Sequence, residues 1–139
     1  MSGSQTPIPP PLTILLVEDD ASSRMLFAHY LKTTPHHLVL AEDGDQALER
    51  FQSGACDLVF LDLHLPRTNG LKVLERMRAW EREQGRAAVP VIMMSSVTPG
   101  EGEVLVQSAD CAGFMPKPCR KADILALVGK YWGYKPMES

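Results

Sequence analysis

The sequence predicts an α/β fold, a single doubly wound (βα)5 domain in which helices cover both faces of a five-stranded parallel sheet. Short, continuous apolar runs alternate with helix-like segments along the whole chain. The apolar runs end in acidic residues, serines or prolines, as strands buried on both faces do where they leave the sheet. The 139 residues, of which 45% are hydrophobic, suffice for one core and are too few for two ordinary domains.

The first strand is predicted in the run TILLVEDD, where Ile14–Val17 are apolar and three acids follow. A run of this kind suits a strand buried on both faces, so its charges must lie at its carboxyl end. A helix is expected next, with Ser22 and Ser23 as its capping residues. Pro35 then breaks the chain, and the run HLVLAEDG predicts the second strand.

The alternation continues through the rest of the chain. Ala47, Leu48 and Phe51 have helical spacing, and the strand CDLVFLDL follows, closed by Pro66. A helix is expected from about Gly70, and then a buried strand in PVIMMSS. The last elements are a weaker helix over Pro99 to Ser108, a short strand in GFMPKP, and a clear helix with apolar residues at Ile124, Leu127, Val128 and Tyr131.

The flanks and the composition limit what the protein can do. We expect a flexible proline-rich tail or linker over 1–11, the domain over 12–133 and a C-terminal tail over 134–139. A formal net charge of -3 offers no basic surface, so direct nucleic-acid binding is not expected. No apolar run approaches the roughly 20 residues that span a bilayer, and the start lacks a signal peptide, so we expect a cytoplasmic protein without direct membrane contact. The three cysteines lack paired metal-ligand spacing and are expected to be reduced thiols.

Polar side chains follow the predicted strands at their carboxyl ends. They are Glu18, Asp19, Asp20, Asp62, Ser95 and Lys117. Because functional groups of an open parallel sheet gather beyond these ends, where the strand order reverses, we expect the side chains to converge. Crowded carboxylates repel each other unless a cation neutralises them, and Mg²⁺ prefers oxygen ligands. Asp19, Asp62 and the backbone carbonyl of His64 can supply the protein's share of a Mg²⁺ site.

A lysine and a serine in such a site suit a phosphoryl group. The ammonium of Lys117 is a compact positive charge for an anionic oxygen, and the hydroxyl of a serine can donate a hydrogen bond to another oxygen. With a carboxylate as the acceptor, the product would be an acyl phosphate, a known form of nucleophilic catalysis by aspartate.

Four separated motifs resemble those of the response-regulator receiver domain: ILLVEDD, DLVFLDLHLPRTNG, PVIMMSS and GFMPKP. The resemblance covers about Leu12 to Tyr131 and implies a flavodoxin-like sheet with strand order 2-1-3-4-5. It also implies that Asp62 accepts phosphate from a histidine kinase. The remaining implied roles are Mg²⁺ binding by Glu18 and Asp19 together with Asp62, phosphoryl contacts by Ser95 and Lys117, and an activation switch at Ser95 and Phe114.

The sequence departs from the receiver pattern at four positions. Glu18 stands where many receivers have Asp, and Ser95 replaces the more usual Thr. Ser96 follows where a small apolar residue is frequent. His64 occupies a position that borders the phosphoryl site and tunes hydrolysis in the family, and whether its imidazole helps or obstructs water stays open.

Other candidate residues have plainer interpretations. Asp20 is expected to start a helix rather than to act as a third metal ligand. Phe114 as plain core stays open beside its role as a switch. Met93 and Met94 are expected to pack in the core. Ordinary roles are expected for three imidazoles and two thiols: His29, His36, His37, Cys111 and Cys119.

The leading hypothesis is a two-component phosphorelay receiver that takes a phosphoryl group from a phosphohistidine onto Asp62 and then switches protein contacts. Its expected partners are a histidine kinase or histidine phosphotransfer protein and a downstream protein target. Homodimerisation stays open. After Tyr131 only WGYKPMES remains, so the output is expected to lie elsewhere. A stand-alone regulator and a fragment of a hybrid kinase both fit, and RMRAWEREQGRAAVPVIMMSS favours the second.

Two other classes of function compete with this hypothesis. A Mg²⁺-dependent phosphohydrolase with an aspartyl-phosphate intermediate would usually carry a second Asp two residues after the nucleophile, where this chain has His64. It would also need a substrate-binding cap domain, and the sequence predicts none. A receiver fold that serves only as an interaction module, without phosphorylation, is disfavoured by the intact site residues. We therefore expect self-catalysed phosphotransfer and autodephosphorylation rather than an enzyme.

Overall fold

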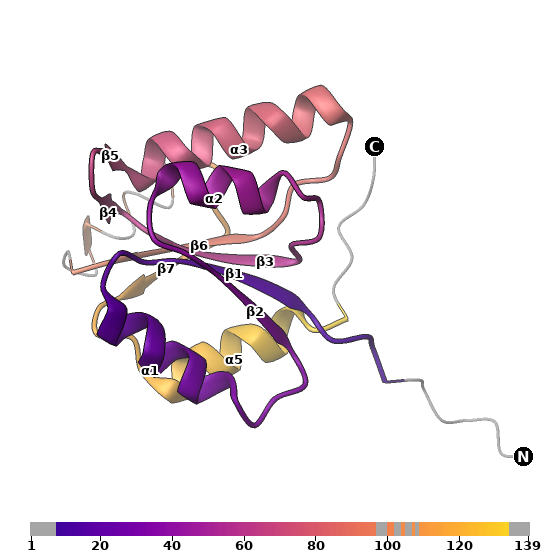
Figure 1. Ribbon diagram of the computed structural model, residues 1–139, viewed down its shortest axis with the longest axis vertical. Helices are drawn as coiled ribbons and strands as arrows, with labels where there is room; N and C mark the ends of the chain where they lie inside the picture. Colours follow the sequence, from indigo (N-terminus) through magenta and orange to yellow (C-terminus); the bar gives the residue numbers. More distant parts are fainter. Residues whose placement is uncertain (1–7, 97–99, 102–103, 105–106, 108, 134–139) are drawn as a thin grey trace, which may run out of the picture.

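The five apolar runs form one parallel sheet between two layers of helices (Figure 1). The computed structural model describes residues 8–96, 100–101, 104, 107 and 109–133. The strands of this sheet are β1 (Thr13–Val17), β2 (His37–Ala41), β3 (Leu58–Asp62), β6 (Val91–Ser95) and β7 (Gly113–Pro116). The described helices are α1 (Ala21–Leu31), α2 (Gly44–Phe51), α3 (Gly70–Gln84) and α5 (Lys121–Tyr131). The weaker helix expected over 99–108 falls largely outside the described residues.

The strand order is β2-β1-β3-β6-β7, which confirms the predicted order 2-1-3-4-5. Every pairing in this sheet is parallel, and Leu15 of β1 lies between Val39 of β2 and Val59 of β3. The chain therefore builds the sheet outward in both directions from β1. The reversal between β1 and β3 leaves a crevice at their carboxyl ends, which is where α/β proteins of this type place their ligands.

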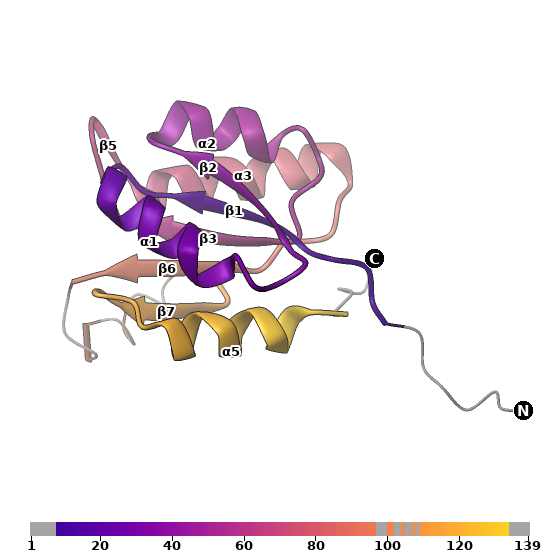
Figure 2. The ribbon, with the colours of Figure 1, turned by 60° about the horizontal axis from the view of Figure 1, so that its bottom comes forward.

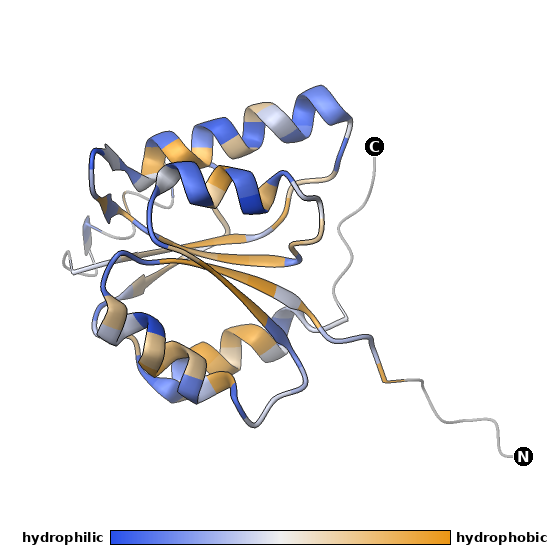
Figure 3. Ribbon diagram, in the orientation of Figure 1, coloured by the Kyte–Doolittle hydropathy of each residue, from blue (hydrophilic) through white to orange (hydrophobic). Residues whose placement is uncertain are grey.

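The two faces of the sheet bury two separate hydrophobic clusters. Leu15 and Val17 point to the face covered by α2 and α3, whereas Ile14 and Leu16 point to the face covered by α1 and α5. Figure 2 shows these helical layers from another side, and Figure 3 shows that the central strands are mostly hydrophobic. Because successive side chains of a strand alternate between faces, a continuous apolar run fills both clusters. The expected packing of Met93 and Met94 is confirmed, since both are buried.

Helix α1 begins one residue after Asp20, which is its N-cap. The Asp20 carboxylate accepts hydrogen bonds from the backbone N–H and the hydroxyl of Ser23, both at 2.8 Å. The expectation that Ser22 and Ser23 cap this helix is therefore wrong. An aspartate caps as well as a serine does, and Asp20 already has the extended backbone that a cap needs. The expectation that Asp20 starts the helix is confirmed.

A small hairpin lies between β3 and α3, where the sequence predicted only the strand CDLVFLDL, closed by Pro66, and then a helix. Strand β3 ends at Asp62, and β4 (His64–Leu65) pairs antiparallel with β5 (Thr68–Asn69). The hairpin brings Gly70 back against β3, where its N–H donates to the Leu63 carbonyl at 2.7 Å. A Cβ atom at Gly70 would collide with the backbone oxygen of Asp62, so only glycine fits this close approach.

Residues at the N-terminal flank contact the end of α5. The indole N–H of Trp132 donates to the backbone oxygens of Pro9 and Pro10, at 3.2 and 3.0 Å. The backbone N–H of Leu12 donates to Nδ1 of His36, whose ring also packs edge-on against Trp132. Within the described part of the chain, no helix has both the length and the apolar character needed to cross a membrane.

Candidate functional site

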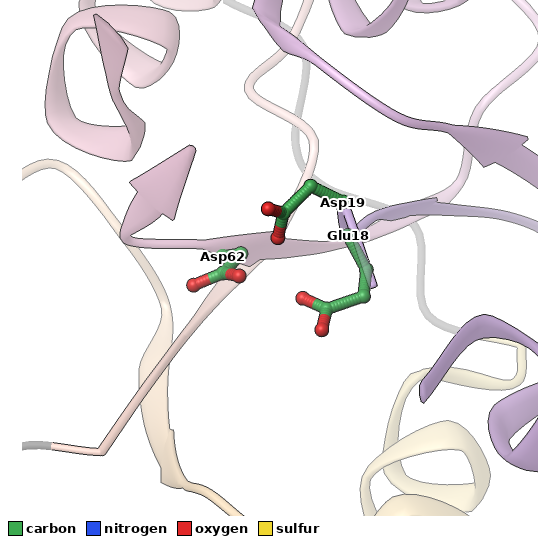
Figure 4. A group of neighbouring side chains, drawn as sticks. All are labelled: Glu18, Asp19 and Asp62. Atoms are coloured by element: carbon green, nitrogen blue, oxygen red, sulfur yellow. The ribbon is translucent and has the colours of Figure 1, made fainter. Parts of the chain in front are cut away.

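Three carboxylates meet beyond the carboxyl ends of β1 and β3 (Figure 4). Glu18 follows β1 directly, Asp19 is next to it, and Asp62 is the last residue of β3. Each offers an oxygen, and the three oxygens lie within 4.8 Å of one another. Glu18 and Asp62 are buried, with 2% and 3% of their surface exposed, whereas Asp19 is exposed. We call Glu18, Asp19 and Asp62 the acidic cluster.

Lys117, which follows the edge strand β7, contacts two residues of this cluster. Its Nζ donates to Oδ2 of Asp62 at 2.8 Å, and to Oε1 and Oε2 of Glu18 at 3.0 and 2.9 Å. Its backbone N–H donates to the carbonyl of Ser95 at 2.7 Å, which fixes the residue just after β7 to the end of β6. The ends of four strands are therefore tied together by this lysine.

The charges of the site are only partly balanced. The pKa of Glu18 is raised from 4.5 to about 7, mainly by burial and also by the hydrogen bond and negative charge of Asp62, while Lys117 acts in the opposite direction. Burial alone would lower the pKa of Lys117, but its hydrogen bonds and charge interactions with Asp62 and Glu18 outweigh burial and raise it. One lysine thus faces three acids, and a further cation would stabilise the ionised cluster.

The residues of the acidic cluster fit a hard divalent cation. Every candidate ligand is a carboxylate oxygen, which Mg²⁺ prefers, and two of the three carboxylates are buried where their repulsion is strongest. The backbone carbonyl of His64 as a fourth ligand stays a prediction.

The hairpin after β3 positions Asp62. Its Oδ1 accepts a hydrogen bond from the backbone N–H of His64 at 3.0 Å, while Oδ2 accepts from Lys117. The carboxylate is thereby held by one neutral and one charged donor, in a strand whose other residues are all buried. The His64 side chain itself is exposed, at the position beside the acidic cluster that the sequence predicted.

The expected switch residues Ser95 and Phe114 belong to β6 and β7, the two strands that follow β3 in the sheet. Ser95 ends β6 and is fully buried, with its carbonyl bonded to Lys117. Ser96 is exposed and lines the same cavity as Lys117. Phe114 lies in β7 opposite Met93. It is half-buried and packs against the hydrophobic residues under α2 and α3. Both of its open interpretations, core residue and switch, therefore stay predictions.

A cavity of about 350 Å³ opens beside Glu18 and Lys117 on the α1 side of the sheet. Its wall is mostly apolar and includes Leu26, Phe27 and Tyr30 of α1. Cys119 also lines it, and burial raises the pKa of this thiol to about 11, which keeps it protonated at neutral pH.

Arg24 of α1 is a charged residue near the site that the sequence analysis missed. Its guanidinium donates to the backbone carbonyl of Glu18 at 2.8 Å and to Oε1 of Glu42 at 3.0 Å. The only signal available in the sequence was a basic residue one turn into the helix that follows the acids. That signal does not say which way a long side chain turns.

The model of the family described as the response regulator receiver domain matches residues 14–129. The chain belongs to this family, whose members are the receiver domains of two-component systems. Among curated proteins, the chain is 32% identical over 114 residues to the uncharacterized transcriptional regulatory protein YcbL of Bacillus subtilis, covering 82% of this chain and 48% of that protein. It is 28% identical over 132 residues to the sensor protein GacS of Pseudomonas syringae, covering 91% of this chain and 14% of that one. The chain thus spans less than half the length of these relatives.

Two solved structures illustrate the similarity of the fold. One is the co-crystal structure of the Saccharomyces cerevisiae histidine phosphotransfer signaling protein Ypd1 with the receiver domain of the response regulator Ssk1. The match has a TM-score of 0.82 at 20% identity and covers 94% of this chain and 95% of the matched chain. The other is the receiver domain of sensor histidine kinase PA1611 from Pseudomonas aeruginosa, with a magnesium ion coordinated in the active site cleft. Its TM-score is 0.76 at 22% identity, with 89% and 99% of the two chains covered.

Proposed function

We propose that Asp62 is the phosphoacceptor of this receiver and takes a phosphoryl group from a phosphohistidine of a partner protein. One observation carries the proposal: the Asp62 carboxylate is buried at the strand reversal, and Lys117 and the His64 N–H both donate to it. In the transfer, an Asp62 oxygen forms a bond to phosphorus while the bond from phosphorus to the histidine nitrogen breaks. The imidazole leaves with the electron pair of that bond, and Asp62 becomes an acyl phosphate.

Each residue of the site has a proposed task in this transfer. Glu18, Asp19 and Asp62 would hold Mg²⁺, which supplies charge neutralisation for the phosphoryl oxygens when bound. Lys117 pairs with an anionic phosphoryl oxygen, because its ammonium already donates to Oδ2 of Asp62 and therefore lies next to the acceptor carboxylate. The Ser95 hydroxyl and the Phe114 ring adjust to the new charge and change the contacts of the protein with its target.

The proposed partner of the site is a helix that carries the phosphohistidine, from a histidine phosphotransfer protein or a histidine kinase. On α1, the neighbouring residues Met25 and Leu26 expose 73% and 48% of their surface, so apolar side chains are accessible to a partner there. Leu26 also lines the cavity beside Glu18 and Lys117, so an apolar helix face placed there would lie next to the acceptor. The similarity to the Ssk1 receiver, which is crystallised with Ypd1, supports this choice.

The sequence relatives support a place in a phosphorelay. The curated relatives include the sensor protein GacS and hybrid signal transduction histidine kinase M of Dictyostelium discoideum. We propose that this receiver works inside the cell as a hybrid-kinase-type receiver and acts on a downstream protein. Its role is that of a phosphoacceptor rather than of an enzyme with an external substrate.

Intact-mass spectrometry after incubation with acetyl phosphate and Mg²⁺ tests the phosphoacceptor. We expect the wild type to gain one phosphoryl group, and the gain to disappear in Asp62→Asn and after chelation of Mg²⁺. Asp45→Asn is the matched control, because Asp45 is an exposed aspartate on α2. An undiminished gain of mass in Asp62→Asn would overturn the assignment. Repeated turnover of a small phosphomonoester would instead indicate a phosphohydrolase, and failure to bind Mg²⁺ or beryllofluoride would indicate a pure interaction module.

A further inference from the structure

The turn after β1, which carries Glu18 and Asp19 and which we call the acidic turn, is held by its backbone as well as by its side chains. The N–H of Glu18 donates to the Ala41 carbonyl of β2 at 3.0 Å. The carbonyl of Glu18 accepts from Nη1 of Arg24 at 2.8 Å. Two residues later, the Asp20 carboxylate is fixed by its hydrogen bonds to Ser23. Polar groups on both sides of Glu18 and Asp19 are thus anchored.

Arg24 is the anchor that reaches the turn through a side chain of α1. Its side chain is only 15% exposed and spans from α1 to the loop after β2, where Nη2 bonds the Glu42 carboxylate at 3.0 Å. Glu42 is itself fixed through its backbone N–H, which donates to Oε1 of Gln46 at 3.0 Å. The guanidinium therefore has one acceptor in the acidic turn and one in a neighbouring loop, and its planar fork sets the distance between them.

We propose that Arg24 is a positioning residue for the metal site: by holding the Glu18 carbonyl, it sets the turn that carries the Glu18 and Asp19 carboxylates. This inference rests on the proposed function, in which these carboxylates hold Mg²⁺. No contact of Arg24 with a carboxylate of the acidic cluster is recorded among the described residues, and its bond in the turn is to the backbone. Residues that orient metal ligands from outside the coordination sphere typically affect metal affinity by about 10-fold to 100-fold.

The alternative role of Arg24 has the opposite sign. A positive charge next to a metal site repels the cation, so if Arg24 acted only through its charge, a neutral replacement would tighten Mg²⁺ binding. If Arg24 positions the turn, the same replacement weakens Mg²⁺ binding, because the carboxylates lose their fixed geometry. The direction of the change in affinity therefore separates the two roles.

The experiment is a titration with MgCl₂ alone, followed by calorimetry and by the amide NMR signals of the acidic turn, on the full chain and three variants. We expect Arg24→Gln to weaken Mg²⁺ affinity by about tenfold, and Arg24→Lys by about threefold, because one ammonium can still donate to the Glu18 carbonyl. Glu42→Gln is the matched control: it breaks the ion pair to the β2 loop but leaves the bond to Glu18, and it should change affinity by less than about twofold.

Equal or tighter Mg²⁺ binding by Arg24→Gln would overturn the proposal. Unfolding of each metal-free variant in urea shows whether it folds. If Arg24→Gln does not fold, the lysine variant decides. An Mg²⁺ affinity of Arg24→Lys that is measurably below that of the wild type supports positioning. An affinity equal to that of the wild type, or tighter, contradicts it. A wild type that does not bind Mg²⁺ at all refutes the proposed function itself, which is a separate result.

Discussion

Two groups of buried charge lie at opposite ends of the sheet and differ in their balance. At the amino end, Arg78 and Glu81 of α3 form an ion pair at 2.8 Å, with side chains 7% and 4% exposed. At the carboxyl end, Glu18 and Asp62 are buried to a similar degree around the half-buried Lys117. The α3 ion pair has one buried charge of each sign, with the exposed carboxylate of Asp110 at 3.6 Å from Nε of Arg78, whereas the acidic cluster has three acids to one lysine, and two of these acids are buried.

The α3 ion pair has further hydrogen-bond partners in neighbouring segments of the protein. The second oxygen of Glu81 accepts from the Val89 N–H at 2.7 Å, and Nε of Arg78 donates to the Asp110 carbonyl at 3.0 Å. These bonds tie α3 to the segments that precede β6 and β7. Removing one partner of such a buried ion pair is strongly destabilising, whereas an excess of buried carboxylates suits the binding of a cation.

The largest expected effect comes from breaking the α3 ion pair. Arg78→Met leaves Glu81 buried without its partner, so the free energy of unfolding in urea should fall by about 3 to 5 kcal/mol. Arg82→Met, an exposed position on the same helix, is the control and should change it by less than about 0.5 kcal/mol. A loss in Arg78→Met as small as that of the control would mean that the ion pair does not stabilise the fold.

A smaller effect is expected from the pH dependence of the metal-free acidic cluster. The folded pKa of Glu18, about 7, lies above its ordinary value of 4.5, so the folded state favours the protonated form. This contribution to stability is complete below the ordinary value and is lost as the pH rises through about 7. Between about pH 5 and pH 8, the wild type should lose about 2 kcal/mol relative to Glu18→Gln, whose amide does not titrate.

The measurement for Glu18 is urea unfolding of both proteins over this pH range, with Mg²⁺ chelated. If the difference in free energy of unfolding between the wild type and Glu18→Gln stayed constant over this pH range, the pKa of Glu18 would not be raised in the folded protein. In the α3 ion pair the second acid, Asp110, is exposed, so Glu81→Gln removes the buried partner of Arg78 and should destabilise the protein at both ends of the range.

The smallest expected effect has the opposite sign to a normal core mutation. In the metal-free protein at about pH 8, Asp62→Asn removes one of the crowded negative charges and should raise the free energy of unfolding by about 1 kcal/mol. An asparagine oxygen can still accept from Lys117 or from the His64 N–H. Destabilisation by Asp62→Asn as large as that by Glu81→Gln would remove the contrast between the two groups of charge.

The parts of the molecule that were predictable from the sequence depend on local patterns. The apolar runs predicted each strand of the sheet, and the acids that follow Val17 and end β3 predicted the place of the acidic cluster. This worked because a strand buried on both faces must carry its charges at its ends, and parallel strands bring those ends together.

The features that were missed depend on the length and direction of single side chains or on backbone turns. The hairpin of β4 and β5 forms because the chain returns to β3 at Gly70, and its strands of two residues each are too short to leave an apolar pattern in the sequence. The contacts of Arg24 with Glu18 and of Arg78 with Glu81 and Asp110 join segments that are brought together only by the fold. Sequence spacing does not specify which acceptor a long side chain reaches.

The most direct test of the central claim is the dependence of unfolding free energy on Mg²⁺ concentration in the wild type and in Asp62→Asn. A ligand that binds only the folded state stabilises it in proportion to the logarithm of its concentration above the dissociation constant. The account predicts that Mg²⁺ stabilises the wild type and that most of this gain is absent in Asp62→Asn. A wild type whose stability does not respond to Mg²⁺, or an Asp62→Asn variant that responds equally, would contradict it.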